Sequence, residues 1–186
     1  MKILNKEKLD DENILRKLKE SVFIYPTDTI YGIGCNALDS KLVQKIREIK
    51  KRQSQPFSVI APNKEWIYKN CEVDDNAENW IKKLPGPYTL ILKIKNKKSV
   101  AENVSISETL GVRMPNHWFL KVVEKLGIPV VTTSVNLTGE AFMTSLENLP
   151  EEIKNKVDYI IYEGEKKARP SEIVDLSYKR IKIIKR

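Results

Sequence analysis

The sequence predicts a single α/β or α+β domain over residues 1–186. Apolar runs of strand length alternate along the whole chain with amphipathic stretches of helical period, and no internal repeat is visible. The 186 residues, of which 41% are hydrophobic, are enough for one packed core. We therefore expect strands and helices to be mixed throughout one folding unit.

The first elements follow from residue spacing and helix-capping signals. Residues 11–20 carry apolar side chains at helical spacing, and residues 21–25 (SVFIY) form a short apolar run that predicts a buried strand. A loop is expected over 26–36, because it contains proline and two glycines. An amphipathic helix follows over 40–52 with Asp39 or Ser40 as its cap.

The middle of the chain alternates in the same way. A strand is expected at 57–61, and helical pieces are expected at 63–70 and 76–84. The turn Pro85-Gly86-Pro87 then separates these helices from strands at 88–94 and 111–114.

The C-terminal third is predicted from the same two periodicities. The expected helices are 118–126, which stops at Gly127, and 146–157, which begins after Ser145. The expected strands are 128–133, 158–162, 173–176 and 180–184. Between the last helix and the last two strands lies a charged stretch, 163–171, that we interpret as a surface loop.

Composition excludes several classes of protein. The N-terminus, MKILNKEKLDDENILRKLKE, is too charged for a signal peptide, and no apolar run approaches the roughly 20 residues that cross a bilayer. We therefore expect a cytoplasmic protein with no membrane partner. Cys35, Cys71 and His117 are too few and too scattered for a zinc site, whereas a hard cation such as Mg²⁺ remains compatible.

The charge balance points to anionic partners. The formal net charge is +8, which suits nucleotides or RNA, although many of the lysines serve solubility alone. No G-x-x-x-x-G-K-[ST] phosphate loop is present. Residues 32–37 fit G-x-G-x-x-A, but 26–29 separate them from the strand and the helix cap comes too late for a dinucleotide fold. The glycines more plausibly allow close approach to a ligand or another backbone.

Polar residues gather at the ends of the predicted strands. Thr27, Asp28 and Thr29 follow the strand 21–25. The threonine hydroxyls could bind a small polar ligand, but a turn stabilised by local side-chain to backbone hydrogen bonds is the stronger interpretation. Thr132, Ser134 and Asn136 alternate beyond an apolar strand, so their side chains share one face. This pattern is typical of a ligand-binding edge in an open sheet, or of a strand that turns into a polar loop.

Three cations stand out from the surface lysines. Lys50 and Arg52 end the helix 40–52, where they either offset the helix dipole or bind phosphates in a cleft. Arg113 lies in an apolar strand, so it needs an anionic partner from the protein or from a substrate. Together these features describe a basic, hydroxyl-lined cleft without an evident nucleophile or base. Such a cleft suits phosphoryl or nucleotidyl transfer, which depends on positioning and charge stabilisation.

Six segments carry a family resemblance in order and spacing. They are YPTDTIYGIGCNA (25–37), IKKR (49–52) followed by QPFSVI (55–60), LPGPYTLIL (84–92), GVRMPNH (111–117), TTSVNLTGE (132–140) and PSEIVDL (170–176). The chain resembles the YrdC-like family of threonylcarbamoyl-AMP synthases over residues 20–186. The distant pairing of K-x-R with S-x-N is the most specific part of the match.

The resemblance implies a fold and a reaction. The fold is an α/β structure with a twisted mixed sheet and flanking helices around a deep basic cavity, here a single YrdC-like domain over 1–186 without the second domain of longer members. The reaction joins L-threonine, bicarbonate and ATP into threonylcarbamoyl-adenylate and pyrophosphate. A partner transferase then uses the adenylate to modify an adenosine beside the anticodon of tRNA.

The resemblance also assigns roles to matching residues. Lys50 and Arg52 are expected to hold ATP phosphates and to stabilise the charge of the leaving pyrophosphate, which makes them the catalytic pair. The other residues implied for ATP are Thr109, Ser134 and Asn136. The residues implied for L-threonine are Thr29, Arg113, Thr132 and Ser171. No protein metal ligand is assigned, and Mg²⁺ is expected to accompany ATP.

Three departures from the family pattern concern threonine recognition. Gln53 stands where many members have proline, Ile60 lies near a position where some have histidine, and Glu172 replaces a common threonine. Two alternatives therefore remain beside the synthase. One is a paralogue of the same fold with a changed amino-acid pocket, and the other is an RNA-binding module that uses the basic face without catalysis.

Overall fold

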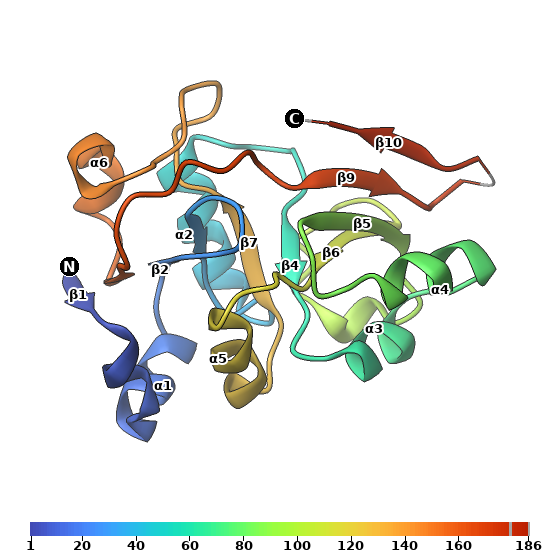
Figure 1. The fold of residues 1–186 in the computed structure, drawn as a ribbon, viewed down its shortest axis with the longest axis horizontal. Helices are drawn as coiled ribbons and strands as arrows, with labels where there is room; N and C mark the ends of the chain where they lie inside the picture. Colours follow the sequence, from blue (N-terminus) through green and yellow to red (C-terminus); the bar gives the residue numbers. More distant parts are fainter. Residues whose placement is uncertain (179, 186) are drawn as a thin grey trace.

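The computed structural model describes residues 1–178 and 180–185. Within them, a mixed sheet of ten strands has the order β1-β8-β2-β3-β7-β4-β6-β5-β9-β10 (Figure 1). The strands are β1 (Lys2–Leu4), β2 (Phe23–Tyr25), β3 (Gly32–Gly34), β4 (Ser58–Ile60), β5 (Tyr88–Lys93), β6 (Thr109–Arg113), β7 (Val130–Ser134), β8 (Tyr159–Ile161), β9 (Glu172–Asp175) and β10 (Lys182–Ile184). The mixed α/β sheet that was predicted is therefore confirmed.

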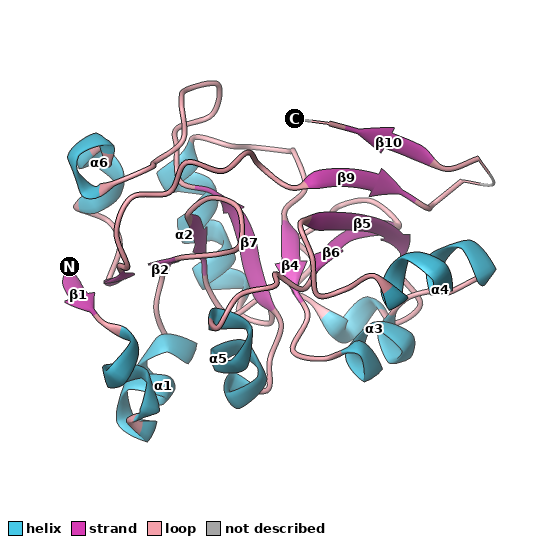
Figure 2. Cartoon of the chain, viewed as in Figure 1, coloured by secondary structure: helices cyan, strands magenta, loops and turns pink. Residues whose placement is uncertain are grey.

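Short helices surround the sheet (Figure 2). They are α1 (Glu12–Lys19), α2 (Ser40–Lys50), α3 (Lys64–Asn70), α4 (Asp75–Lys82), α5 (Phe119–Leu126) and α6 (Glu151–Lys154), with 3-10 turns η1 (Lys6–Asp10), η2 (Lys97–Ser99) and η3 (Leu146–Asn148). None of the described helices combines the length and the apolar character that a membrane crossing requires.

Side-chain caps explain where the helices begin. The carboxylate of Asp39 accepts hydrogen bonds from the backbone N–H groups of Lys41 and Leu42, which confirms the predicted cap of α2. Asn63 caps α3 in the same manner. At the other end of α5, Gly127 adopts the left-handed conformation that terminates a helix (φ 67°).

Two predicted elements differ from the structure, and one strand was not predicted. Residues 32–34 form strand β3 instead of a loop, because β2 and β7 pair with this glycine-rich segment from both sides. The helix expected over 146–157 is interrupted at Pro150, which separates η3 from α6, because proline disfavours helical backbone in the residue before it. The N-terminal residues 2–4 form β1, an unpredicted strand that pairs with β8.

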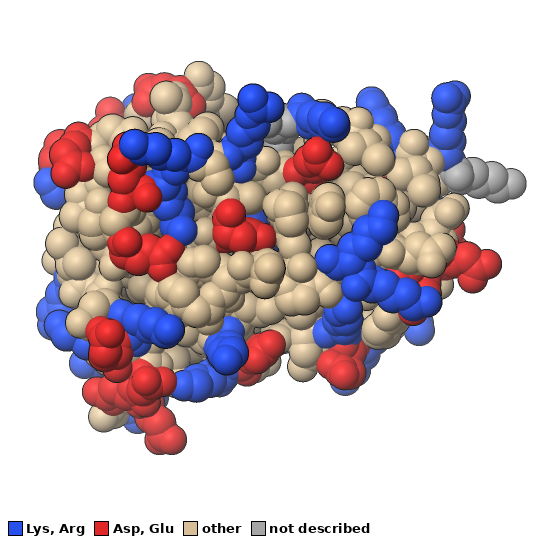
Figure 3. Space-filling model, in the orientation of Figure 1, with Lys and Arg blue, Asp and Glu red and all other residues tan. Residues whose placement is uncertain are grey.

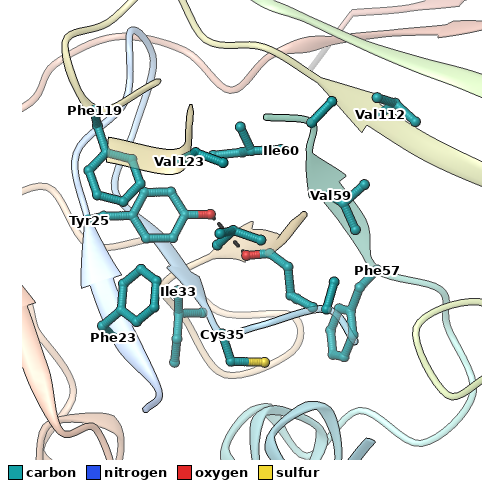
Figure 4. Close-up of a cluster of buried hydrophobic side chains, with 14 of the residues drawn as sticks. Phe23, Tyr25, Ile33, Cys35, Phe57, Val59, Ile60, Val112, Phe119 and Val123 are labelled. Atoms are coloured by element: carbon teal, nitrogen blue, oxygen red, sulfur yellow. Dashed lines mark hydrogen bonds between the residues drawn. The ribbon is translucent and has the colours of Figure 1, made fainter. Parts of the chain in front are cut away.

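The core beneath β2, β3 and β7 brings backbones unusually close together (Figure 4). The ring of Tyr25 stacks on Phe119 with 4.5 Å between centroids, and its hydroxyl donates to the carbonyl oxygen of Val131 at 3.1 Å. A Cβ added at Gly34 would lie 1.9 Å from the same oxygen. The lack of a side chain at Gly34 therefore allows two backbones to lie close together, as one of the interpretations of the sequence proposed. The two backbones belong to neighbouring strands of the sheet, β3 and β7.

The positive charge is spread over the face seen in Figure 3. Blue Lys and Arg side chains alternate there with red Asp and Glu side chains, and no single-sign field covers this face. The net charge of +8 thus does not mark a patch on this side of the molecule. Two arginines, Arg52 and Arg113, line a cavity in the molecule.

Candidate active site

A cavity of about 320 Å³ opens on one face of the sheet, over β4, β5, β6, β7 and β9. Its volume is within the range of small-molecule sites. Two arginines, Arg52 and Arg113, line it, and hydroxyl side chains form much of the remaining wall: Ser58, Thr89, Thr109, Thr132, Ser134 and Ser171.

Strand register explains why these side chains meet. Ser58 of β4 is the cross-strand partner of both Gly111 in β6 and Thr132 in β7, so all three positions lie on the same face. A Cβ added at Gly111 would lie 2.3 Å from the Ser58 hydroxyl oxygen. The absence of a side chain at Gly111 therefore leaves room for the Ser58 side chain on this face.

Arg113 lies at the buried end of the cavity, and one edge of its guanidinium is already bound by other side chains of the protein. Its NH2 atom lies 2.9 Å from Asp28 Oδ1 and donates to Thr29 Oγ1 at 3.2 Å. Its Nε has no hydrogen-bond partner among the described residues. Burial lowers the pKa of Arg113, and the carboxylate of Asp28 opposes this effect. A buried N–H without a partner is unfavourable, so this end of the cavity favours an anionic ligand.

The end of α2 separates the two residues of the K-x-R segment. Lys51 between them adopts a left-handed conformation (φ 51°), which is uncommon for a residue other than glycine. The chain therefore turns sharply after Lys50. As a result, Lys50 points inward beneath β7, whereas Arg52 reaches the rim of the cavity.

Lys50 is 2% exposed and lies behind the cavity wall. Its ammonium donates to the carbonyl oxygens of Ser134 and Asn136 at 2.5 and 2.8 Å, and to Asn136 Oδ1 at 2.9 Å. Burial, together with the positive charge of Arg52, lowers the pKa of Lys50 to about 7. The family resemblance predicts that Lys50 contacts a phosphate. In this structure, the ammonium of Lys50 is instead hydrogen-bonded to the loop that contains Ser134 and Asn136.

Arg52 has a different environment at the rim. Its NH2 donates to the carbonyl oxygen of Pro56 at 2.6 Å, and its guanidinium lies over the Phe57 ring at 5.0 Å from the centroid. A longer contact of 3.4 Å joins NH1 to Thr133 Oγ1. These contacts hold a permanently charged group beside the cavity, where it can meet a phosphate.

The structure brings most of the predicted site residues together. The predicted residues that line the cavity are Arg52, Thr109, Arg113, Thr132, Ser134 and Ser171. Thr29 contacts the cavity through Arg113, and Asn136 contacts it through Ser134. Lys50 lies one layer further back, beneath the same loop.

Sequence reasoning missed Thr89, which lines the cavity beside the predicted Ser171. Thr89 Oγ1 and Ser171 Oγ are hydrogen-bonded at 2.8 Å between β5 and the start of β9, and both are buried. Asp28, the partner of Arg113, was noted beside Thr27 and Thr29 but was given no role at the site. The alternation of the segment YTLIL already places Thr89 on the same face as Ile91, so period-2 spacing could have identified it.

A strap formed by residues 162–171 joins β8 to β9 (orange-red in Figure 1), and its last residues, Pro170 and Ser171, line the cavity. Tyr31, which lines the cavity, donates its hydroxyl hydrogen to Gly164 O at 2.6 Å. The carboxylate of Glu163 accepts from His117 Nε2 at 2.9 Å and from Trp118 Nε1 at 2.6 Å. These contacts fix one end of the strap to the cavity wall and to the segment that begins α5.

The donor atoms in the cavity restrict how it could hold a metal ion. Among the described residues, no group of three or more His, Cys, Asp or Glu side chains is arranged for metal binding, and the lining contains no carboxylate. Hydroxyl oxygens alone are weak ligands, and Mg²⁺ usually keeps waters and substrate phosphates in its shell. The cavity therefore fits Mg²⁺ as an ion carried by a nucleotide.

Comparison with known proteins shows which family the chain belongs to. The family model for Sua5, YciO and YrdC proteins, described as "Telomere recombination", matches residues 16–186. The chain belongs to the Sua5/YciO/YrdC family. It is 35% identical over 187 residues to a putative threonylcarbamoyl-AMP synthase of Methanocaldococcus jannaschii, with coverage of 96% of this chain and 86% of the relative. It is 32% identical to the uncharacterized protein YciO of Escherichia coli, with coverage of 86% and 79%.

Solved structures of the Sua5/YciO/YrdC family agree with the fold. Sua5 of P. abyssi in complex with L-threonine has a TM-score of 0.88 and 28% identity, over 98% of this chain and 56% of that chain. YciO of E. coli has a TM-score of 0.84 at 23% identity, over 99% and 93%. The chain spans about half the length of the Sua5 protein.

Proposed function

We propose that this protein is a threonylcarbamoyl-AMP synthase, which forms L-threonylcarbamoyladenylate and pyrophosphate from L-threonine, bicarbonate and ATP. The observation that carries the proposal is the pair of arginines, Arg52 and Arg113, in one hydroxyl-lined cavity. An amino-acid carboxylate and a nucleotide phosphate each need a cation, and the cavity offers two. The names of the relatives support the same conclusion.

The buried end is proposed to bind L-threonine. The guanidinium of Arg113, which lines the cavity, would donate to the substrate carboxylate. Thr29 holds one edge of the guanidinium. Thr132 and Ser171 add buried hydroxyls for the polar groups of the amino acid.

The rim is proposed to bind ATP. Arg52 stabilises the negative charge that develops on the leaving pyrophosphate, since a fixed cation at this point acts in the transition state without reorganisation. Thr109 and Ser134 add hydroxyls on the same wall. Asn136 and Lys50 support Ser134 from behind.

The chemistry requires positioning more than proton transfer. The amine of threonine and bicarbonate condense to a carbamate and water. A carbamate oxygen then attacks the α-phosphorus of ATP, forms the new O–P bond and breaks the bond to the oxygen that bridges the α- and β-phosphates. The cavity holds the two reactants close, which supplies much of the acceleration in such reactions. Mg²⁺ bound to the phosphates would neutralise part of their charge.

The wider role of the protein follows from its product. Threonylcarbamoyl-adenylate is an activated acyl phosphate anhydride, so a transferase must accept the threonylcarbamoyl group and pass it to tRNA. We place both partners, like ATP, in the cytoplasm, and we treat residues 1–186 as one catalytic domain. The interspersed charges on the face seen in Figure 3 are compatible with a transient tRNA contact and do not require one.

A second candidate is a paralogue that keeps the cavity and acts on another amino acid or anion. The similarity to YciO of E. coli, at 32% identity, favours it. Ile60, one of the departures from the family pattern, is the cross-strand partner of Arg113, so a change there lies next to the proposed threonine end.

Pyrophosphate release separates these candidates. Purified protein with ATP and Mg²⁺ is assayed while L-threonine and bicarbonate are omitted in turn. The synthase predicts release only when both are present, and loss of release in Arg113→Met. Lys41→Met, an exposed change on α2, is the matched control and should retain full release. Release that is independent of threonine would favour the paralogue.

A further inference from the structure

We infer that Lys50 is a positioning residue that acts through Ser134, and that it turns the Ser134 hydroxyl into a pure acceptor toward the cavity. The inference rests on the proposed use of the cavity for ATP. The ligand group that contacts Ser134 is then either a hydrogen-bond donor, such as a ribose hydroxyl, or a cation that accompanies the phosphates.

The hydrogen bonds of Lys50 account for all of its donors. An ammonium has three N–H groups and no acceptor. Its contacts are two carbonyl oxygens, those of Ser134 and Asn136, and the side-chain oxygen Oδ1 of Asn136, all within 2.9 Å. The neighbouring chain is tied in as well, because Thr138 donates its hydroxyl hydrogen to Lys50 O at 2.8 Å. In this arrangement no N–H of Lys50 is left over for a phosphate.

The amide of Asn136 has only one orientation that satisfies its neighbours. Oδ1 accepts from Lys50 and from Ser134 Oγ, which lies 2.6 Å away. Nδ2 donates to Glu140 O at 2.7 Å. The opposite orientation would direct N–H groups at the ammonium and oxygen at a carbonyl. Lys50 and the carbonyl oxygen of Glu140 therefore together determine which end of the Asn136 amide meets Ser134.

The consequence falls on Ser134, the member of the network that lines the cavity. A serine hydroxyl has one hydrogen, and here Asn136 receives it. Only lone pairs of Ser134 Oγ remain for a ligand. They accept from a hydroxyl or amine hydrogen or coordinate a cation, and they repel an unprotonated phosphate oxygen.

The protonation state of Lys50 should also affect the hydrogen bonds between Lys50, Asn136 and Ser134. Because burial and Arg52 lower the pKa of Lys50 to about 7, the lysine can lose a proton near neutral pH. A neutral amine has two hydrogens for three acceptors, so one contact to the loop is lost. Ligand affinity through Ser134 should then depend on pH in this range. The charged group that acts on Lys50 at this site is Arg52, whose positive charge adds to the effect of burial.

A double-mutant cycle on ATP binding tests the inference. The dissociation constant of ATP is measured for Lys50→Met, Ser134→Ala and the double variant by calorimetry. If Lys50 acts through Ser134, each single change weakens binding about tenfold and the double variant is no weaker than the worse single one. Thr109→Ala is the matched control, because its effect should multiply with that of Lys50→Met. Effects of Lys50→Met and Ser134→Ala that multiply would overturn the inference in favour of a direct phosphate contact.

A second variant covers the case in which Lys50→Met does not fold. Asn136→Asp keeps an oxygen for Lys50 and Ser134 and adds a negative charge beside the ammonium. This charge should raise the pKa of Lys50, so the pH dependence of ATP affinity should move to higher pH. An unchanged pH profile would overturn the inference. Both experiments measure binding, so a protein that shows the coupling without forming the adenylate would contradict the proposed function alone.

Discussion

Arg113 and Asp28 form a buried ion pair at the closed end of the cavity, with 2.9 Å between NH2 and Oδ1. The second oxygen of Asp28 accepts from the backbone N–H of Asn116 at 2.9 Å. The carboxylate therefore fixes the arginine from one side and ties together the loops that follow β2 and β6. The guanidinium is thus held in place where Arg113 lines the cavity.

Replacement of Arg113 by lysine should separate charge from geometry. Lysine retains a positive charge near Asp28 and loses the planar fork that meets a carboxylate. We expect the KM for threonine to rise by about tenfold or more, with a smaller change in kcat. Steady-state kinetics at varied threonine check this. Arg16→Lys, on exposed α1, is the control, and an unchanged threonine KM in Arg113→Lys would refute the assignment.

Gly34→Ala should destabilise the protein strongly. The new Cβ would lie 1.9 Å from Val131 O, so β3 and β7 would have to move apart. Overpacking of this kind costs about 3 kcal/mol or more. Gly139→Ala is the matched control, because a Cβ there meets nothing within 4 Å and only its positive φ is unfavourable. Urea unfolding of both variants should show a much larger loss for Gly34→Ala, and equal losses would contradict the contact.

Part of this arrangement could be predicted from the sequence and part could not. Period-2 and helical spacing identified most strands and helices, because each pattern follows from the local chain. Strand β3 escaped prediction because glycine has little strand preference, and its partner Ser134 is distant in sequence. The direction of Lys50 also escaped prediction, since it depends on the left-handed turn at Lys51, a residue that rarely adopts it. The role of each cavity residue stays a prediction.

The stability of the protein should depend on pH through Lys50. Its folded pKa is about 7, below the ordinary 10.5, so between these values the unfolded chain binds the extra proton. The free energy of unfolding from this group therefore rises as pH increases from 7 toward 10.5, by up to about 1.4 kcal/mol per pH unit. Denaturation at several pH values checks this. Lys50→Met should lose the rise, whereas Lys41→Met should keep it, and identical pH curves for wild type and Lys50→Met would contradict the burial of a charge.

The strap should loosen when Glu163 is neutralised. Burial raises the pKa of Glu163, but hydrogen bonds from Lys166, Trp118 and His117 outweigh it and lower the pKa overall. The carboxylate thus remains charged through mildly acidic pH and continues to anchor the strap. Glu163→Gln should increase hydrogen exchange of residues 163–166 several-fold. Glu165→Gln, at a more exposed glutamate of the same strap, should leave it unchanged, and equal exchange in both variants would argue against the anchor.

The central claim is that the cavity joins threonine, bicarbonate and ATP into one adenylate. Its most direct test is mass spectrometry of the nucleotide product formed with ¹³C-bicarbonate, L-threonine, ATP and Mg²⁺. The account predicts an adenylate that carries both threonine and the ¹³C label, and no such product from Arg113→Met. An unlabelled threonyl-adenylate, or unchanged ATP with a folded protein that binds both substrates, would contradict it.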